Sequence, residues 1–287
     1  MKTLRLRLPV AALLLSLNAG AAPSCSPPAN LQGELDPARI QRLAEDLLPC
    51  LANPDSKLRD QLAFDTFYTW ARSGKLQAAT LQRLRAQLLA VLDGPADAAG
   101  VHQPFAALAL SEVARVDRVQ PYLSPAERED LVAHAVRYLA GVRDYRGSSA
   151  IEGWRHGVAH GADLALQLGV NDTLSADQRR RLLAAVSQQV LADHKHSYRF
   201  GEGARLARAA LNIQLKLGAD AAEWQRWLDE LVAPVMKAKA LDETAWIDLH
   251  NLREFLWPLL AHVLDLQDVA LRQRLQIPLQ TTLRALP

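Results

Sequence analysis

The feature that most constrains the fold of this chain is a set of helix-start signals that recurs along its length. In each signal, a serine or aspartate stands at the N-cap position, with Pro directly after it or Glu or Gln three residues later. Apolar residues at helical spacing follow each signal, and no segment alternates apolar and polar residues as a strand does. The signals, at Asp36, Ser124, Ser175 and Asp220, therefore predict an all-α protein.

Helix starts follow one another at intervals of roughly 19 to 26 residues, which predicts about eleven helices in residues 36–287. An antiparallel pair then takes roughly 40 to 48 residues, the period of HEAT-type α-α superhelices. The motifs do not repeat at that period, so we expect divergent pairs in one HEAT-like all-α domain over residues 36–287. The almost wholly apolar segment 101–119 should be central, and the helix at 243–264 should bend or break near Pro258.

The first 21 residues have the order of a secretory signal peptide. Three basic residues precede an apolar run at residues 8–17, and small residues follow at 19–21. The apolar run is too short to span a membrane. We therefore expect residues 1–21 to be removed, residues 22–35 to form a Pro-rich tail, and the chain to be exported to a bacterial periplasm.

The composition is that of a globular protein, with 49% hydrophobic and 22% charged residues. The whole chain has 33 basic and 31 acidic residues, and loss of the leader's three basic residues leaves 30 basic ones. No run of Lys and Arg with interleaved aromatics is present, so nucleic-acid binding is not supported. No segment after the leader is long and apolar enough to predict a transmembrane helix.

The chain has two cysteines, Cys25 and Cys50, and both follow the predicted leader. In an oxidising compartment, a disulfide between them would join the Pro-rich tail to the end of the first helix. The alternatives are two unrelated thiols, or a lipid anchor on Cys25. The residues before Cys25 are a poor lipoprotein signal, so we favour the disulfide.

The residues best suited to chemistry lie between positions 152 and 163. If this segment is a helix, Glu152, His156, His160 and Asp163 fall at roughly 0°, 40°, 80° and 20° around its axis. Trp154 would lie on the opposite, core-facing side. The sequence therefore groups two imidazoles and two carboxylates on one helix face.

Three interpretations of this face remain open. Histidines at i and i+4 can bind one metal ion, although Gly157 stands where the His-Glu-x-x-His pattern has its Glu. A carboxylate can instead orient an imidazole for general-base work. The third interpretation is a polar face without chemistry, and Gly161 would then serve close helix packing.

A second polar cluster contains His194, His196 and Glu202, at the end of one predicted helix and the start of the next. If the linking loop is extended, the two imidazoles point the same way. Helix C-termini also attract histidine for dipole reasons alone. If the two segments pack side by side, His156, His160, His194 and His196 become a candidate metal set, suited to a divalent ion such as zinc.

Two further groups have structural and functional interpretations. Asp144 and Arg146 can hold a carboxylate or phosphate at the rim of a site, or pair with each other across a turn, which is the default. His250 lies inside a long apolar helix, where a hydrogen bond across a helix interface is favoured.

The sequence resembles a bacterial family described as domain of unknown function 2785. The likeness spans most of the chain after the leader and is strongest in two blocks: Asp144, Arg146 and Gly147, then Gly153, Trp154, His156, Ala159, His160, Gly161, Ala162 and Asp163. Weaker matches are Leu58, Arg59 and Asp60 with Trp70, and Tyr198 with Glu202, Arg205, Leu206 and Ala207. Glu152 is not part of the family pattern. The resemblance implies an all-helical fold and supplies no reaction.

Two functions compete at this point. The favoured one is a binding or scaffold module of the cell envelope, whose partner is an envelope protein, peptide or polymer and which needs no cofactor. The alternative is a periplasmic hydrolase that uses a divalent metal or a histidine–carboxylate pair. The candidate residues of a ligand groove are Asp144, Arg146, Trp154, His156, His160, Asp163, Tyr198 and Glu202.

Overall fold

The computed structural model describes residues 25–26, 31, 35–238 and 242–287. The predicted signal peptide, residues 1–21, and most of the Pro-rich tail lie outside these residues. The all-α class is confirmed, with one short hairpin. The elements are α1 (Pro37–Asp46), η1 (Leu48–Ala52), η2 (Lys57–Phe64), α2 (Asp65–Arg72), α3 (Ala78–Asp93), α4 (His102–Val119), α5 (Pro125–Gly141), β1 (Ser148–Ser149), β2 (Gly153–Trp154), α6 (Gly157–Gly169), α7 (Ala176–Gln189), α8 (Glu202–Lys216), α9 (Ala221–Met236), α10 (Glu243–Leu264) and α11 (Val269–Ala285).

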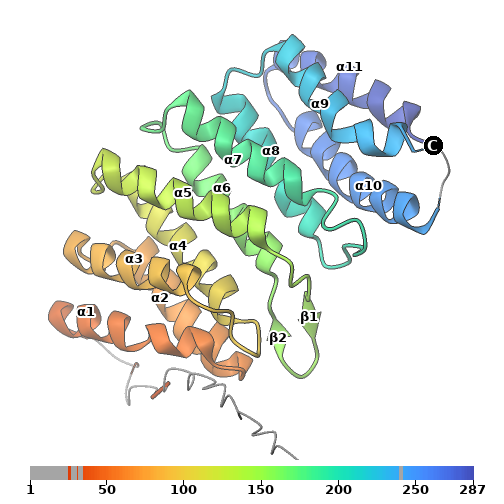
Figure 1. Ribbon diagram of the computed structural model, residues 1–287. Coiled ribbons are helices and arrows are strands. Elements are labelled where there is room, and N and C mark those ends of the chain that lie inside the picture. Colours follow the sequence, from red (N-terminus) through yellow and green to blue (C-terminus); the bar gives the residue numbers. More distant parts are fainter. Residues whose placement is uncertain (1–24, 27–30, 32–34, 239–241) are drawn as a thin grey trace, which may run out of the picture.

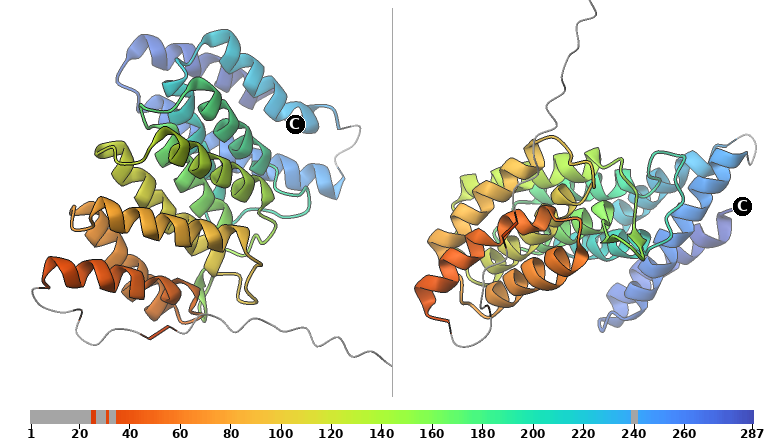
Figure 2. Two further views of the ribbon diagram at one scale, coloured as in Figure 1. Left: turned by 60° about the vertical axis from the view of Figure 1, so that its left-hand side comes forward. Right: turned by 90° about the horizontal axis from the view of Figure 1, so that it is seen from below.

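The helices form two stacked layers, with consecutive helices as antiparallel pairs (Figure 1). In one layer α4, α6, α8 and α10 pack in that order, and in the other α3, α5 and α7 do so. Helix α11 packs on α9 and α10 at the far end from α1, which makes the molecule elongated (Figure 2). The closer comparison with HEAT-type repeats stays a prediction.

The helices begin where their capping residues predict. The Asp36 carboxylate accepts a hydrogen bond from the Arg39 amide at 2.9 Å, which caps α1. Ser124 and Ser175 each form a complete capping box, and the Asp220 side chain caps α9. These side chains satisfy amides that a helix leaves without partners, so they fix each starting point locally.

Two glycines let the layers approach closely. A Cβ on Gly161 of α6 would lie 2.8 Å from a methyl of Leu139 on α5, as expected for a packing glycine. A Cβ on Gly203 of α8 would collide with the main chain of Glu254 on α10. The buried apolar side chains form a continuous core from Ile40 to Leu279, and α4 at its centre is buried on most sides, as predicted.

Helix α10 is continuous through Pro258, so it has no break there, and a bend at this residue stays a prediction. The π-helical segment η2 leads directly into α2. One local prediction is wrong. Glu152 and Trp154, predicted on a helix, lie in a hairpin, where Ser148 pairs with Trp154. Gly153 has a φ of +69°, a left-handed value that an α-helix does not contain, so the helix does not run through this position and α6 begins at Gly157.

The disulfide between Cys25 and Cys50 is present, and it joins the tail to η1 just after α1. Among the described residues, no helix has the length and apolar character needed to cross a membrane.

Candidate functional site

The β1–β2 hairpin is held in place by a buried arginine. The guanidinium of Arg59, on η2, donates to the carbonyls of Glu152 at 2.8 Å and Trp154 at 3.1 Å. Its other terminal nitrogen donates to the carbonyls of Asn53 and Pro54. The side chain is fully buried, so these main-chain oxygens take the place of water around its charge. Arg59 therefore sets the position of the hairpin relative to the helices.

His156 stands at the junction between the hairpin and α6, with a left-handed φ of 57°. Its Nε2 donates to the carbonyl of Phe200 at 3.0 Å, and the ring stacks on Trp154 with centroids 4.6 Å apart. These contacts hold a backbone conformation that costs a non-glycine residue of order 1 kcal/mol. Burial lowers the pKa of His156, and Glu202 opposes this effect. The imidazole is therefore a neutral hydrogen-bond donor to the main chain.

His160 lies one turn further along α6 and is also buried. Its Nδ1 donates to the carbonyl of Pro104 on α4 at 3.1 Å, and its ring meets that of His156 edge to face, 5.8 Å away. Burial, with the nearby His156 as a smaller cause, lowers the pKa of His160 to about 3. His160 is therefore neutral at physiological pH and links α6 to α4.

Two acidic side chains of the predicted groove are also engaged. Glu202 is 2% exposed and accepts a hydrogen bond from the Phe200 amide at 2.9 Å. Its other oxygen lies 3.7 Å from Nε2 of His156, beyond hydrogen-bond distance and next to the nitrogen already bonded to Phe200. Asp163 forms an ion pair with Arg205 of α8, and burial raises its pKa although Arg205 opposes this. We call Trp154, His156, His160 and Glu202 the histidine cluster.

The loop between α7 and α8 is tied down by α10. Asp248 of α10 holds Nδ1 of His194 at 2.8 Å, and Asn251 bonds the amide of Tyr198 and the carbonyl of His196. His250 donates to the carbonyl of Tyr198 at 2.9 Å, the structural role favoured from sequence. These bonds fix the loop in one shape.

The loop shape separates its two histidines. We expected both imidazoles to point the same way in an extended loop, but His194 has a left-handed φ of 61°, so the loop is not extended there. His194 turns to α10, whereas His196 stacks on Tyr145 with centroids 5.1 Å apart. Tyr198 is buried, and its hydroxyl donates to the carbonyl of Gln189 at 2.7 Å. Tyr198 therefore supports the loop and does not line a groove.

The predicted metal set does not assemble. Within the part of the chain that the structure describes, no group of three or more His, Cys, Asp or Glu side chains is arranged to hold a metal ion. His156 and His160 each bond a main-chain carbonyl, and His194 is occupied by Asp248. The structure brings together His156, His160 and Glu202, but not the two histidine pairs around one point.

An open pocket adjoins the histidine cluster at Phe200, which lines the pocket and whose carbonyl bonds His156. It has a volume of 580 Å³ and is lined by Arg143 and residues 145–149, by Glu152 and Arg155 of the hairpin, and by residues of the α7–α8 loop. We call it the basic pocket, because five of its lining side chains are basic and two are acidic. The ring of Phe200 lies against Gly147, where no Cβ would fit.

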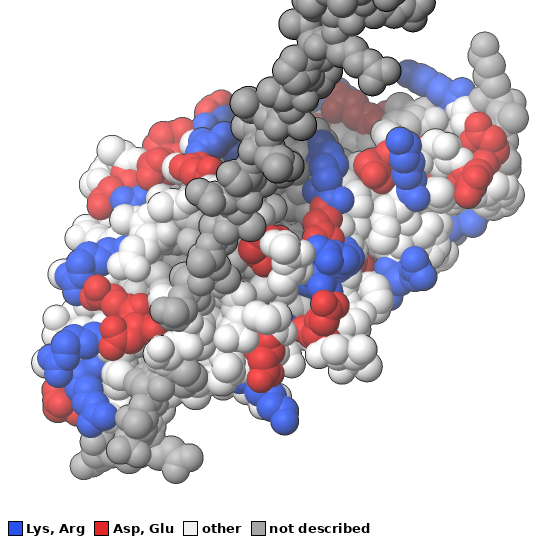
Figure 3. Space-filling model, turned by 60° about the horizontal axis from the view of Figure 1, so that its bottom comes forward, with Lys and Arg blue, Asp and Glu red and all other residues white. Residues whose placement is uncertain are grey.

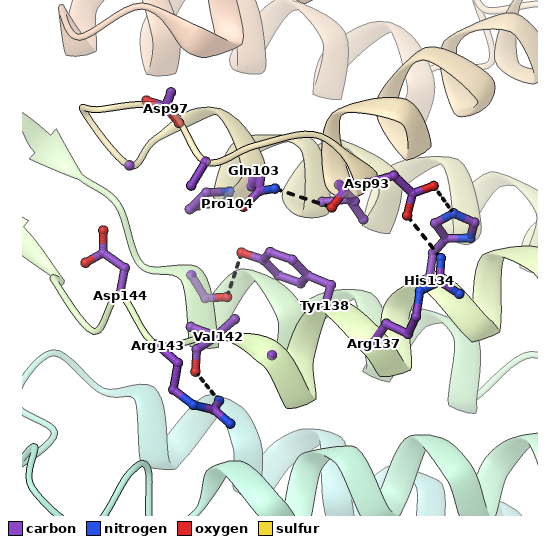
Figure 4. A pocket seen from close by; sticks show the side chains of 15 residues that line it. Asp93, Asp97, Gln103, Pro104, His134, Arg137, Tyr138, Val142, Arg143 and Asp144 are labelled. Carbon is purple, nitrogen blue, oxygen red and sulfur yellow. Dashed lines mark hydrogen bonds and ion pairs between the residues drawn. The ribbon is translucent and has the colours of Figure 1, made fainter. Parts of the chain in front are cut away.

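A second cavity, of 390 Å³, adjoins the basic pocket at Arg143 (Figure 4). Asp93 bonds Nε2 of His134 at 2.9 Å and Arg137 at 3.1 Å, and the Tyr138 hydroxyl donates to the carbonyl of Gly157. Asp144 points to the other end of this cavity in Figure 4. We call it the paired cavity, because its acidic and basic side chains bond to one another.

Asp144 and Arg146 pair with each other, as the default prediction had it, with Nε to Oδ1 at 2.8 Å. The pair packs over Gly100, which has a φ of +67° and no room for a Cβ. It therefore forms the partition between the paired cavity, which Asp144 lines, and the basic pocket, which Arg146 lines. On the face seen in Figure 3, basic and acidic side chains are interspersed, in line with the nearly balanced composition.

The profile of the family described as Protein of unknown function (DUF2785) matches residues 88–261. This span is more than half of the chain and includes the histidine cluster and the basic pocket. The chain belongs to this family. Membership confirms the resemblance expected from the two blocks at 144–163. No curated protein and no solved structure matches the chain, and the family description names no activity.

Sequence reasoning missed most of the lining of the basic pocket, including Tyr145, Lys195 and Arg199. Each stands in a segment between helices, next to residues that were singled out. A usable signal is present, because residues 193–199 contain one acidic and four cationic or imidazole-bearing residues in a loop. The prediction of a metal set uses the imidazoles of this loop and leaves out the cations beside them.

Proposed function

We propose that this chain is a binding module of the cell envelope and that its ligand occupies the basic pocket. One observation carries the proposal. Among the described residues, the Tyr145 hydroxyl and Nε2 of His196 are buried and have no hydrogen-bond partner. Both residues line the basic pocket. Folded proteins rarely leave buried polar atoms unpaired, so a ligand that bonds them would complete the site.

The volume of the pocket suits this role. Pockets that hold small molecules, or one residue of a larger partner, measure roughly 300 to 1,000 Å³. The walls are fixed, because Arg59 holds the hairpin and α10 holds the loop. A site with fixed walls loses little conformational entropy when a ligand binds.

The alternative, a histidine–carboxylate hydrolase, has weaker support. A general base needs a free imidazole nitrogen, with a carboxylate that orients the ring through its other nitrogen. In the histidine cluster, the carboxylate of Glu202 lies near Nε2 of His156, which already bonds Phe200. Both rings are oriented by main-chain carbonyls, Phe200 for His156 and Pro104 for His160, and neither is oriented by a carboxylate.

Export to the periplasm is part of the proposal. The leader-like order of residues 1–21 supports it, and so does the disulfide of Cys25, since disulfides persist in oxidising compartments. Mass spectrometry of the chain from a periplasmic fraction should give an N-terminus at Ala22. An uncleaved chain that stays in the cytoplasmic fraction would contradict this part.

The binding role is tested by blocking the pocket. Ser149 is exposed and lines the pocket, so Ser149→Trp should fill it. The matched control is Ser73→Trp, because Ser73 is also an exposed serine whose hydroxyl bonds the main chain. Purified wild type and both variants are incubated with envelope extract, and bound molecules are identified by mass spectrometry.

We expect a molecule that wild type and Ser73→Trp retain and Ser149→Trp loses. His156→Asn, assayed in parallel, should retain it if folded. Equal recovery by Ser149→Trp and wild type would contradict the proposal, and so would loss of the ligand in His156→Asn alone.

A further inference from the structure

We infer that the basic pocket recognises an oxyanion, the phosphate or carboxylate group of its ligand. This inference rests on the proposed function and adds the chemical class of the ligand. Three features carry it: uncommitted cations at the rim, unpartnered neutral donors at depth, and acidic side chains that are already engaged.

The cations of the pocket divide into two groups. Arg146 pairs with Asp144, and Arg155 donates to the carbonyl of Ala99 at 2.6 Å and pairs with Glu152. Arg143 donates to two carbonyls near the end of α5. The second group is Lys195 and Arg199. Their exposed side chains form no hydrogen bond or ion pair with any other residue that the structure describes.

The deeper part of the pocket offers two neutral donors. Burial raises the pKa of the Tyr145 phenol and lowers the pKa of the His196 imidazole, so the phenol keeps its proton and the imidazole stays neutral. The two rings stack at an interplanar angle of 18°. The phenol O–H and the Nε2–H tautomer of the imidazole can each donate to an oxygen of one anion.

The two acidic residues of the lining do not cancel this charge. The Glu152 carboxylate lies 2.9 Å from Nη1 of Arg155. Asp193 accepts hydrogen bonds at 3.1 Å from the amides of Lys195 and His196, so its carboxylate shapes the loop and keeps its charge. The five basic side chains of the lining still outnumber the two acidic ones, so the pocket keeps a net positive charge for a ligand.

Hydrogen bonds between cationic donors and oxyanions are shorter and roughly twice as strong as neutral ones. At 580 Å³ the pocket is larger than one phosphate or carboxylate. The oxyanion is therefore one end of a larger ligand. The cations at the rim attract its negative charge, and the deeper neutral donors form hydrogen bonds to its oxygens.

The test uses three probes on the purified chain: inorganic phosphate, acetate, and phosphatidylglycerol vesicles with phosphatidylcholine vesicles as the reference. The first two are followed by NMR titration and the vesicles by co-sedimentation. The charge-reversed variant is Lys195→Glu with Arg199→Glu. The control reverses Arg226 and Lys237, which are exposed on or just after α9 and do not line the pocket. Tyr145→Phe, which removes the buried hydroxyl alone, is measured alongside.

We expect at least one anionic probe to bind wild type and the control equally. The charge-reversed variant should bind it at least tenfold more weakly, and Tyr145→Phe several-fold more weakly. Phosphate or acetate binding indicates a free or solvent-borne group, whereas binding only to phosphatidylglycerol vesicles identifies a lipid headgroup as the source. Absence of binding by all three probes, or equal binding by the charge-reversed variant, overturns the inference.

The inference and the proposed function fail separately. If the envelope ligand is lost in Ser149→Trp but retained by the charge-reversed variant, the pocket binds a neutral ligand. The proposed function then stands and the oxyanion inference does not. If Ser149→Trp loses nothing, the proposed function itself has failed.

Discussion

The histidine cluster and the basic pocket meet at Phe200, and their polar groups differ in one respect. In the histidine cluster each imidazole bonds a main-chain carbonyl, and Glu202 bonds an amide. In the basic pocket, two buried polar atoms and two cations have no bond to any described residue. The side chains of the histidine cluster, which have catalytic potential, therefore have a structural role. The polar groups without partners lie in the basic pocket, whose residues are less distinctive in type.

The paired cavity sharpens this comparison. It adjoins the basic pocket and is also lined by charged side chains, three aspartates and two arginines, yet Asp93 bonds both His134 and Arg137 there. Charged side chains that bond one another need no ligand. Lining a cavity is therefore not enough to make a side chain part of a binding site. The two cavities differ in whether their hydrogen-bond donors already have partners.

The largest effect is expected at Arg59, which supports both regions through the hairpin. Arg59→Met removes the charge that four carbonyls and the Asp60 carboxylate surround and frees the hairpin, at about 3 to 5 kcal/mol of unfolding free energy. Chemical denaturation measures this change. The control is Arg83→Met, since Arg83 forms an exposed pair with Glu45 and should cost less than about 1 kcal/mol. Equal losses would show that the hairpin needs no anchor.

The disulfide should stabilise the fold without acting on either region. It closes a loop of 25 residues in sequence, for which chain entropy predicts about 3 kcal/mol. Cys25→Ser with Cys50→Ser should lose that amount in denaturation and keep wild-type binding in the basic pocket. A loss of binding in the folded double variant would mean that the tail takes part in the site.

His160→Ala should act on stability alone. It leaves a cavity between α6 and α4 and an unpaired carbonyl at Pro104, at about 2 kcal/mol. Thermal unfolding measures the loss, and binding of the envelope ligand at a temperature where the variant is folded provides the second readout. If the variant is fully folded but does not bind, the histidine cluster is part of the ligand site.

The same residue predicts a dependence of stability on pH. The pKa of His160 is about 3 in the fold, against 6.5 for an ordinary histidine. The unfolded chain therefore binds the proton first, so this contribution is complete above pH 6.5 and is lost as the pH falls toward 3. The slope is at most about 1.4 kcal/mol per pH unit. His160→Asn should remove this part of the slope between pH 6.5 and 4, and an unchanged slope would show that His160 is not buried as described.

The smallest effect on stability is expected at the rim of the basic pocket. Lys195 and Arg199 are exposed, so their reversal to Glu should change the unfolding free energy by less than about 0.5 kcal/mol. The same double variant should lose binding at least tenfold. Substitutions in the basic pocket should therefore weaken binding and hardly change stability. Substitutions in the histidine cluster should lower stability and leave binding unchanged.

The sequence predicted the helices well because their signals are local. Caps such as Ser124 and Asp220 act within one turn, and the apolar spacing that follows them is read directly. The hairpin at 148–154 escaped prediction because its strands are two residues long and depend on Arg59, about 90 residues earlier in the chain. A bond across that separation leaves no local pattern.

The candidate site was predicted only in part, for a related reason. The proximity of His156, His160 and Glu202 follows from packing of α6 on α8, and the sequence pointed to it. Whether each nitrogen is free depends on the carbonyls of Pro104 and Phe200, which no sequence pattern places. The pairing of Asp144 with Arg146 was predictable because the two residues are neighbours in one turn.

The most direct test follows the imidazole NMR signals of all eight histidines while the purified chain is titrated with the anionic probe that binds it, whether phosphate, acetate or phosphatidylglycerol vesicles, with His196→Asn to assign one of them. The account predicts a saturable shift of the His196 signal and constant signals for His156 and His160. A shift of His156 or His160 with a constant His196 signal would contradict it, because the ligand would then reach the histidine cluster and not the basic pocket.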